Sequence, residues 1–189
     1  MKDFEKDIVH SIAVLLNGGI ILYPTDTIWG IGCDATRPVA IRKIYLLKKR
    51  EEKKSMIILL AHENDIEHYV SNPSKKIIDF LSKQKMPTTA IFENAINLPA
   101  ELYNKDGSIA IRIVKDDFCQ RLISRLGGPL VSTSANVSGE DHPKLFKEIN
   151  DTIKSGVDYV VQHRQNEIKV HHPSPIVRLN SNNEIERVR

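Results

Sequence analysis

The chain has 189 residues, of which 41% are hydrophobic, so it is long and apolar enough to bury the core of one domain. Its 27 basic and 24 acidic residues leave a net charge of +3, which is too small a surplus to indicate nucleic-acid binding. Its two cysteines lie far apart and outside any CxxC motif, which argues against a disulfide framework or a structural zinc site. A charged amino terminus, and no apolar run near the ~20 residues of a membrane span, predict an untargeted cytoplasmic protein.

Helical and extended patterns alternate from the amino terminus onward. Residues 3–17 place apolar side chains on one helical stripe that ends before two glycines, and residues 20–23 are typical of a buried strand. Pro38 begins a second helical pattern. The next predicted elements are an apolar strand over residues 56–60 and helices near residues 63–70 and 74–84.

The second half of the chain continues this alternation. It predicts strands at residues 88–92, 109–113, 130–131, 159–161, 176–179 and 184–188, and helices at residues 116–126 and 144–153. Alternation of this kind predicts an α/β fold with a sheet between helices. Several connections are too short for crossovers, which predicts strands of mixed direction. No repeat or linker divides the chain, so we expect one domain over residues 1–189.

A turn rich in hydroxyls and glycine, PTDTIWGIG, occupies residues 24–32 after the first strand. Pro24 ends the sheet pairing, and the glycines allow the backbone to approach a ligand closely. Ligand loops are common at the carboxyl ends of strands in open α/β sheets, although an ordinary turn with Trp29 in the core fits the same residues. The turn is neither a Walker A loop nor a dinucleotide fingerprint.

Two pairs of polar side chains are spaced two residues apart: Lys48 with Arg50, and Ser134 with Asn136. Residues at this spacing share a face only in extended backbone. Two cations opposite hydroxyls, an amide and free backbone N–H groups suit a polyanion such as a nucleoside triphosphate. The alternatives are a solvated basic end of a helix and an ordinary serine-rich loop.

Five motifs follow one another along the chain, and their order is more informative than any one of them. They are PTDTIWGIG at residues 24–32, KKR at 48–50, SIAIR at 108–112, PLVSTSANVSG at 129–139 and PSPIV at 173–177. Together they resemble the YrdC-like family, the threonylcarbamoyl-AMP synthases of tRNA modification, over about residues 8–189. The resemblance implies a twisted, open mixed sheet flanked by helices, with a concave basic cavity, in a single catalytic domain.

The resemblance also implies a nucleotidyltransferase reaction. L-threonine, bicarbonate and ATP would give threonylcarbamoyl-AMP and pyrophosphate, with Mg²⁺ accompanying ATP and no tightly bound cofactor. A threonylcarbamoyl-transferase complex would then modify a tRNA adenosine beside the anticodon. Carbamate would attack the α-phosphate, so catalysis requires positioning and electrostatic stabilisation rather than a nucleophilic side chain.

The resemblance assigns roles residue by residue. The catalytic positions are Lys48, Arg50, Ser134 and Asn136. The ATP-contacting positions are Arg50, Lys54, Ser108, Ser134 and Arg187. The threonine-binding positions are Thr25, Arg112, Ser132 and Ser174. In this pocket Arg112 is suited to a carboxylate, because its planar guanidinium forms two parallel hydrogen bonds whereas lysine offers a point charge.

Several positions depart from the family pattern, among them Leu59 and His142. Leu59 stands where some longer relatives have a threonine-contacting histidine, and His142 stands where some have a hydroxyl near the nucleotide, so neither receives a role. The other histidines show no HExxH or comparable spacing, and no metal site is predicted in the chain.

Two other functions fit a domain of this kind. One is a module that binds double-stranded RNA or tRNA at the cavity rim without making an adenylate. The other is a detached carbamoyl-transfer domain like that of hydrogenase-maturation proteins, which use carbamoyl phosphate. The intact lysine, arginine, serine and asparagine signatures favour the synthase over the first, and the lack of zinc-finger segments disfavours the second.

Overall fold

The computed structural model describes residues 4–50 and 56–188. Its strands are β1 (Ile21–Tyr23), β2 (Gly30–Gly32), β3 (Ile57–Leu60), β4 (Thr89–Phe92), β5 (Ile109–Ile113), β6 (Leu130–Ser134), β7 (Tyr159–Val160), β8 (Ile176–Leu179) and β9 (Ile185–Arg187). Its helices are α1 (Glu5–Leu16), α2 (Pro38–Leu47), α3 (Lys75–Lys83), α4 (Asp117–Leu126) and α5 (Asp151–Ser155), and its 3₁₀ helices are η1 (Glu63–His68), η2 (Ala100–Leu102) and η3 (Phe146–Glu148).

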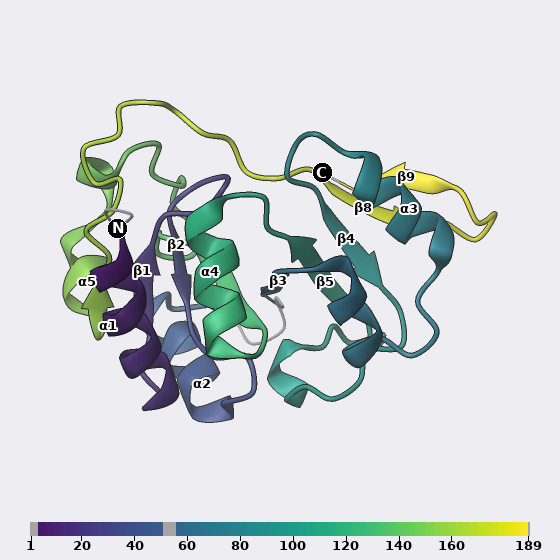
Figure 1. The fold of residues 1–189 in the computed structure, drawn as a ribbon, viewed down its shortest axis with the longest axis horizontal. Coiled ribbons are helices and arrows are strands. Elements are labelled where there is room, and N and C mark those ends of the chain that lie inside the picture. The colour runs from purple at the N-terminus through teal and green to yellow at the C-terminus, as the bar shows by residue number, and fades with distance from the viewer. Residues whose placement is uncertain (1–3, 51–55, 189) are drawn as a thin grey trace.

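The described strands form one open, twisted sheet in the order β7-β1-β2-β6-β3-β5-β4-β8-β9 (Figure 1). Strand β3 is parallel to β5 and antiparallel to β6, and β4 is antiparallel to β5 and parallel to β8. The predicted α/β fold with a sheet of mixed direction is therefore confirmed. Among the described residues, no helix is both long and apolar enough to cross a membrane.

Most predicted elements are present within a residue or two of their expected ends. Two predicted helices differ in kind. Residues 63–68 form a 3₁₀ helix, and the segment near 144–153 divides into η3 and α5, because the Asn150 side chain accepts a hydrogen bond from the Thr152 N–H and starts a new helix there.

Strand β2 is the element that the sequence did not predict, because it lies inside the proposed ligand turn. It pairs with β1 and β6, which leaves little room beside its glycines. A Cβ atom at Gly32 would lie 2.6 Å from the Val131 carbonyl oxygen and 2.7 Å from Cε1 of Tyr23. Glycine is therefore required for these strands to approach one another.

Helices α1 and α4 lie in front of one half of the sheet in the view of Figure 1. Arg121 and Arg125 of α4 both reach Glu5 at the start of α1, at 2.9 and 2.7 Å. The ring of Phe4 packs edge-on against Phe118 with centroids 5.6 Å apart. These contacts hold the two helices together over the buried strands.

A long connection, which we call the crossing segment (residues 161–175), joins β7 at one edge of the sheet to β8 near the other (Figure 1). Arg164 anchors it, since its Nη1 donates to the carbonyl oxygen of Thr25 at 2.9 Å and its Nε donates to Glu167 at 2.7 Å. The segment thereby brings Pro173 and Ser174 to the cavity described below.

Candidate active site

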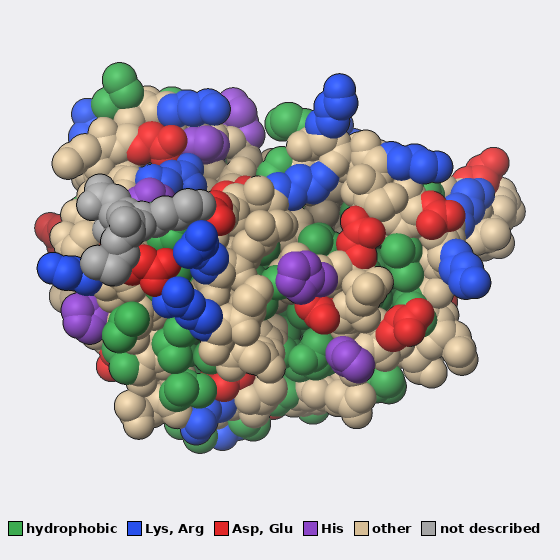
Figure 2. All heavy atoms as spheres, viewed as in Figure 1, with side chains coloured by type: hydrophobic (Ala, Val, Ile, Leu, Met, Phe, Trp, Pro, Cys, Tyr) green, Lys and Arg blue, Asp and Glu red, His purple; other side chains and the backbone are tan. Residues whose placement is uncertain are grey.

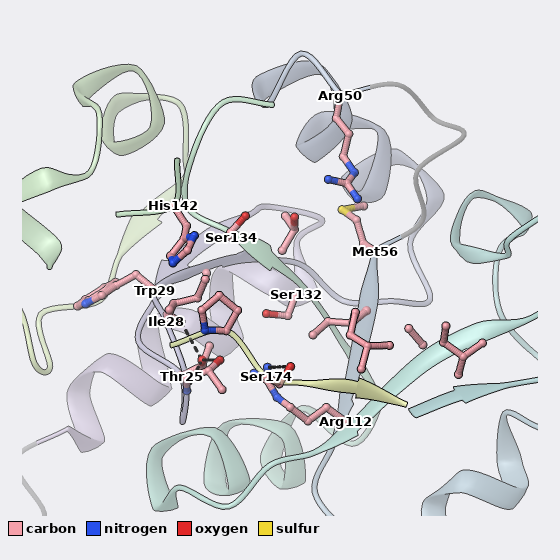
Figure 3. A pocket seen from close by; sticks show the side chains of 18 of the residues that line it. Thr25, Ile28, Trp29, Arg50, Met56, Arg112, Ser132, Ser134, His142 and Ser174 are labelled. Atoms are coloured by element: carbon pink, nitrogen blue, oxygen red, sulfur yellow. Dashed lines mark hydrogen bonds between the residues drawn. The ribbon is translucent and has the colours of Figure 1, made fainter. Parts of the chain in front are cut away.

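A cavity of about 310 Å³ opens beside the central strands of the sheet, β2, β6, β3 and β5. Much of its polar lining comes from the turn after β1, from strands β5 and β6, and from the residues just before β8. Figure 3 shows Arg50 at one end of this cavity and Arg112 at the other, with serine side chains between them. The lining residues are Thr25, Thr27, Ile28, Trp29, Gly30, Arg50, Met56, Ile57, Ile91, Asn104, Ala110, Arg112, Ser132, Thr133, Ser134, His142, Pro173, Ser174 and Ile176.

Six of the residues predicted for the site lie in this one cavity: Thr25, Arg50, Arg112, Ser132, Ser134 and Ser174. They come from positions up to about 150 residues apart in the chain, and all four predicted threonine-binding residues are among them. The fold therefore brings together the side chains that the sequence motifs singled out separately.

The Arg112 guanidinium is held at the base of the cavity by polar contacts. Its Nη2 forms an ion pair of 3.1 Å with Asp26, and its Nη1 lies 3.4 Å from Ser174 Oγ. Its Nε is buried and has no hydrogen-bond partner among the described residues. A buried donor without a partner is costly, so the fold leaves one polar group of Arg112 unsatisfied beside the cavity.

Thr25 lines the cavity, but its hydroxyl also organises the turn. Oγ1 donates to the Ile28 carbonyl oxygen at 2.8 Å and accepts the Thr27 N–H at 3.0 Å. It also lies 2.9 Å from Thr27 Oγ1. Trp29 packs in the core against Phe146, with ring centroids 4.8 Å apart, and also lines the cavity. The turn therefore has one face in the core and one at the cavity wall, and its role as a ligand loop stays a prediction.

Arg50 enters the cavity because the chain turns sharply at the end of α2. Lys49 has a positive φ of 49°, and the Arg50 N–H donates to the Tyr45 carbonyl oxygen at 2.9 Å. The guanidinium then points toward the cavity beside Met56 (Figure 3). Burial lowers the pKa of Arg50 from its usual value, but arginine starts so high that the group stays charged.

Lys48 points the opposite way, into the protein. Its side chain is 1% exposed, and its ammonium donates to the carbonyl oxygens of Ser134 and, at 2.5 Å, Asn136. Burial, with a smaller effect of the Arg50 charge, lowers the pKa of Lys48 to about 7. The prediction that Lys48 and Arg50 share a face is wrong, because the left-handed residue between them replaces an extended backbone.

Ser134 and Asn136 separate in a similar way. Ser134 ends β6 and lines the cavity, but the chain turns at once, and the Asn136 N–H donates to the Ser134 carbonyl oxygen at 2.9 Å. The Asn136 amide nitrogen donates to the carbonyl oxygens of Val137 and Glu140 at 2.9 and 2.7 Å. The shared face predicted for this pair is also wrong, and Asn136 stabilises the loop behind the cavity.

Two predicted ATP-contacting residues, Ser108 and Arg187, are not among the described residues that line the cavity. Ser108 is buried, and its hydroxyl donates to Asp106 at 2.6 Å and accepts from Asn104 at 2.9 Å. Arg187 is exposed on β9. Lys54 lies outside the described residues. Nucleotide contacts by these three side chains stay predictions.

Sequence reasoning missed several residues that the fold places at the site. Thr27 and Asn104 line the cavity, and so does His142, which was noted in the sequence but given no role there and which lies near Trp29 and Ser134 in Figure 3. Asp26 lies directly behind Arg112. Thr27 and Asp26 fall within the motif at residues 24–32, so their position in the motif was the available signal.

The described residues contain no group of three or more His, Cys, Asp or Glu side chains that could hold a metal ion. Cys33 is fully buried, and burial raises the pKa of its thiol well above the usual value. A thiol in this setting is packed rather than nucleophilic.

Comparisons with known proteins agree with this arrangement. The family model for Sua5, YciO and YrdC proteins, described as telomere recombination, matches residues 13–189. The chain therefore belongs to the Sua5/YciO/YrdC family. It is 30% identical to a threonylcarbamoyl-AMP synthase of Pseudoalteromonas translucida over 160 residues, covering 83% of this chain and 86% of that protein.

Solved structures show the same fold. The H234A/Y235A variant of P. abyssi Sua5 superposes with a TM-score of 0.86 at 20% identity, over 98% of this chain and 56% of that one. P. abyssi Sua5 complexed with L-threonine superposes with a TM-score of 0.82 at 18% identity, over 93% of this chain and 51% of that one. The chain thus spans about half the length of these Sua5 chains.

Proposed function

We propose that the protein is an L-threonylcarbamoyladenylate synthase, which makes threonylcarbamoyl-AMP and pyrophosphate from L-threonine, bicarbonate and ATP. The observation that carries the proposal is a single cavity with a buried guanidinium at one end, a second guanidinium at the other, and hydroxyls between them. Such a cavity suits a ligand with two anionic groups, a carboxylate and a phosphate chain.

The end near Arg112 fits an amino acid. The Arg112 guanidinium offers its positive charge to a carboxylate, and Ser132 and Ser174 line the same cavity with their hydroxyl groups. Apolar side chains of Ile91 and Ile176 also line the cavity. Threonine has the matching features, namely a carboxylate, a hydroxyl and one methyl group. The P. abyssi Sua5 structure with L-threonine supports this assignment.

The end near Arg50 fits the phosphates of ATP. In the proposed reaction, the threonine amine first bonds to the carbon of bicarbonate with loss of one water molecule, and an oxygen of the resulting carbamate then bonds to the α-phosphorus while the bond to pyrophosphate breaks. Negative charge builds on the phosphate oxygens, where a fixed guanidinium stabilises it. Ser134 adds a hydroxyl at the same wall. Mg²⁺ would arrive bound to the ATP phosphates as part of the substrate.

The adenylate is an activated carbamate, so its consumer must be an enzyme that transfers the threonylcarbamoyl group to tRNA. We place the reaction in the cytoplasm, together with that transferase complex. Relatives named threonylcarbamoyl-AMP synthase support this role. A module that binds RNA at the cavity rim would not use Arg112, which is only 3% exposed.

The proposal is tested by identifying the product. Purified protein with ATP, L-threonine and labelled bicarbonate should form threonylcarbamoyl-AMP, detected by mass spectrometry with the label in the carbamate. Arg50→Ala should reduce the rate by about 100-fold or more, because it removes a charge from the transition state. Arg42→Ala is the matched control, since Arg42 lies exposed on α2 and pairs with Glu101 outside the cavity. A folded wild-type protein that forms no adenylate would refute the assignment.

A further inference from the structure

Asp26 lies behind Arg112 at the amino-acid end of the cavity, without lining the cavity itself. Its Oδ1 is 3.1 Å from Arg112 Nη2, and the two side chains are 5% and 3% exposed. Its Oδ2 accepts the backbone N–H of Lys115 at 3.0 Å. Lys115 follows β5, the strand that carries Arg112, so one carboxylate ties the turn after β1 to both the side chain and the backbone of this region.

The rest of the guanidinium is held from a different direction. Ser174 Oγ lies 3.4 Å from Arg112 Nη1 and 2.7 Å from Thr89 Oγ1, and Thr89 is the cross-strand partner of Arg112 in the pairing of β4 with β5. Asp26 and Ser174 therefore occupy the two terminal nitrogens. Within the described part of the chain, the buried Nε is left without a hydrogen-bond partner.

We propose that Asp26 is a positioning residue, which fixes the Arg112 guanidinium in the orientation that receives the carboxylate of the amino-acid substrate. A buried ion pair is a poor source of fold stability, because desolvation offsets most of the attraction. It does restrict a flexible side chain to one geometry, and binding by a preorganised group costs less than binding by a mobile one. The inference rests on the proposed function, since it takes an amino acid as the ligand.

The test is the substitution Asp26→Asn, which keeps the size of the side chain and an oxygen for the Lys115 N–H but removes the charge. Threonine affinity, measured by calorimetry, should fall by about tenfold, the cost of immobilising one flexible side chain on binding. ATP affinity should stay at the wild-type value. The matched control is Asp34→Asn, which removes another buried carboxylate with an arginine partner, Arg37 at 3.4 Å, outside the cavity. This control should bind threonine normally.

A double-mutant cycle separates positioning from a general structural effect. If Asp26 acts through Arg112, Asp26→Asn should cost little further threonine affinity in an Arg112→Lys background. An equal loss in both backgrounds, or wild-type affinity in Asp26→Asn, would overturn the proposal. Should Asp26→Asn fail to fold, Asp26→Glu provides the same comparison, because its longer side chain keeps the charge but shifts the guanidinium.

A ligand-free crystal structure of Asp26→Asn keeps this inference separate from the proposed function. The proposal expects the Arg112 guanidinium to leave its position beside Ser174. An unmoved guanidinium would refute the role of Asp26, whatever the substrate. Failure of the wild-type protein to bind threonine would instead refute the proposed function, and the position of the guanidinium would still decide whether Asp26 holds it.

Discussion

The Lys48 ammonium donates a hydrogen bond of 2.5 Å to the carbonyl oxygen of Asn136, so the lysine of the Lys-x-Arg motif holds the loop of the Ser-x-Asn motif. A second hydrogen bond runs in the other direction, because the Ser138 N–H donates to the Lys48 carbonyl oxygen at 2.8 Å. The two motifs are therefore joined through backbone atoms behind the cavity. Arg50 and Ser134, one from each motif, line the cavity next to these hydrogen bonds.

Lys48→Met should weaken both the fold and the proposed reaction. It removes the donor from two carbonyl oxygens, which should cost about 1–3 kcal/mol in the free energy of unfolding and shift Ser134. Lys43→Met is the control, because Lys43 lies on the same helix and also donates to a carbonyl oxygen, that of Gly18 at 3.0 Å, but at an exposed site. Urea unfolding and adenylate formation provide the two readouts. Equal effects of the two substitutions would contradict the role given to Lys48.

The lowered pKa of Lys48 predicts a specific pH dependence of stability. Burial lowers this pKa from 10.5 to about 7, so between these values the unfolded chain binds a proton that the folded protein does not. Stability contributed by this group must therefore rise with pH from about 7 to 10.5, by up to about 1.4 kcal/mol per pH unit. The difference in unfolding free energy between wild type and Lys48→Met should grow accordingly from pH 7 to 9. A constant difference would show that Lys48 titrates normally.

Gly32→Ala should destabilise the sheet beside the cavity. Its Cβ atom would lie 2.6 Å from a backbone oxygen of Val131 and 2.7 Å from the buried ring of Tyr23, and neither can move freely. We expect a loss of about 1–3 kcal/mol in the free energy of unfolding. Gly128→Ala is the matched control, since nothing lies within 4 Å of a Cβ atom there. Thermal unfolding of the two variants tests the difference, and similar melting temperatures would refute it.

L-serine should be a poorer substrate than L-threonine. It lacks only the methyl group, and one methyl group in an apolar niche is worth about ten- to two-hundred-fold in kcat/KM. Ile91 and Ile176 at the cavity wall provide apolar surface for that group. Competition between the two amino acids in one reaction, followed by mass spectrometry of both adenylates, measures the ratio. Equal use of both would show that the cavity has no niche for the methyl group.

The sequence predicted the positions of most helices and strands because apolar periodicity and the Gly and Pro signals are local. It did not predict strand β2, because a glycine-rich motif that approaches two neighbouring strands resembles a loop. The orientation of Lys48 also could not be predicted. It depends on a left-handed conformation at Lys49, a residue type with no preference for that conformation.

The candidate site was predicted more completely at its amino-acid end than at its nucleotide end. Thr25, Arg112 and Ser132 lie in or beside strands, where position in a motif sets the direction of the side chain. Asn104 lies outside every motif, and the part of the cavity wall that it forms depends on tertiary packing that no local pattern encodes. Asp26 was overlooked because its partner is 86 residues away in the chain.

Pyrophosphate release from ATP, measured with each substrate omitted in turn, tests the central claim most directly. A synthase that joins carbamate formation to adenylation should release pyrophosphate only when L-threonine and bicarbonate are both present. Arg50→Ala should lower that release by about 100-fold, and Arg42→Ala should leave it unchanged. Release that needs neither substrate, or no release from folded protein with all three, would contradict the account.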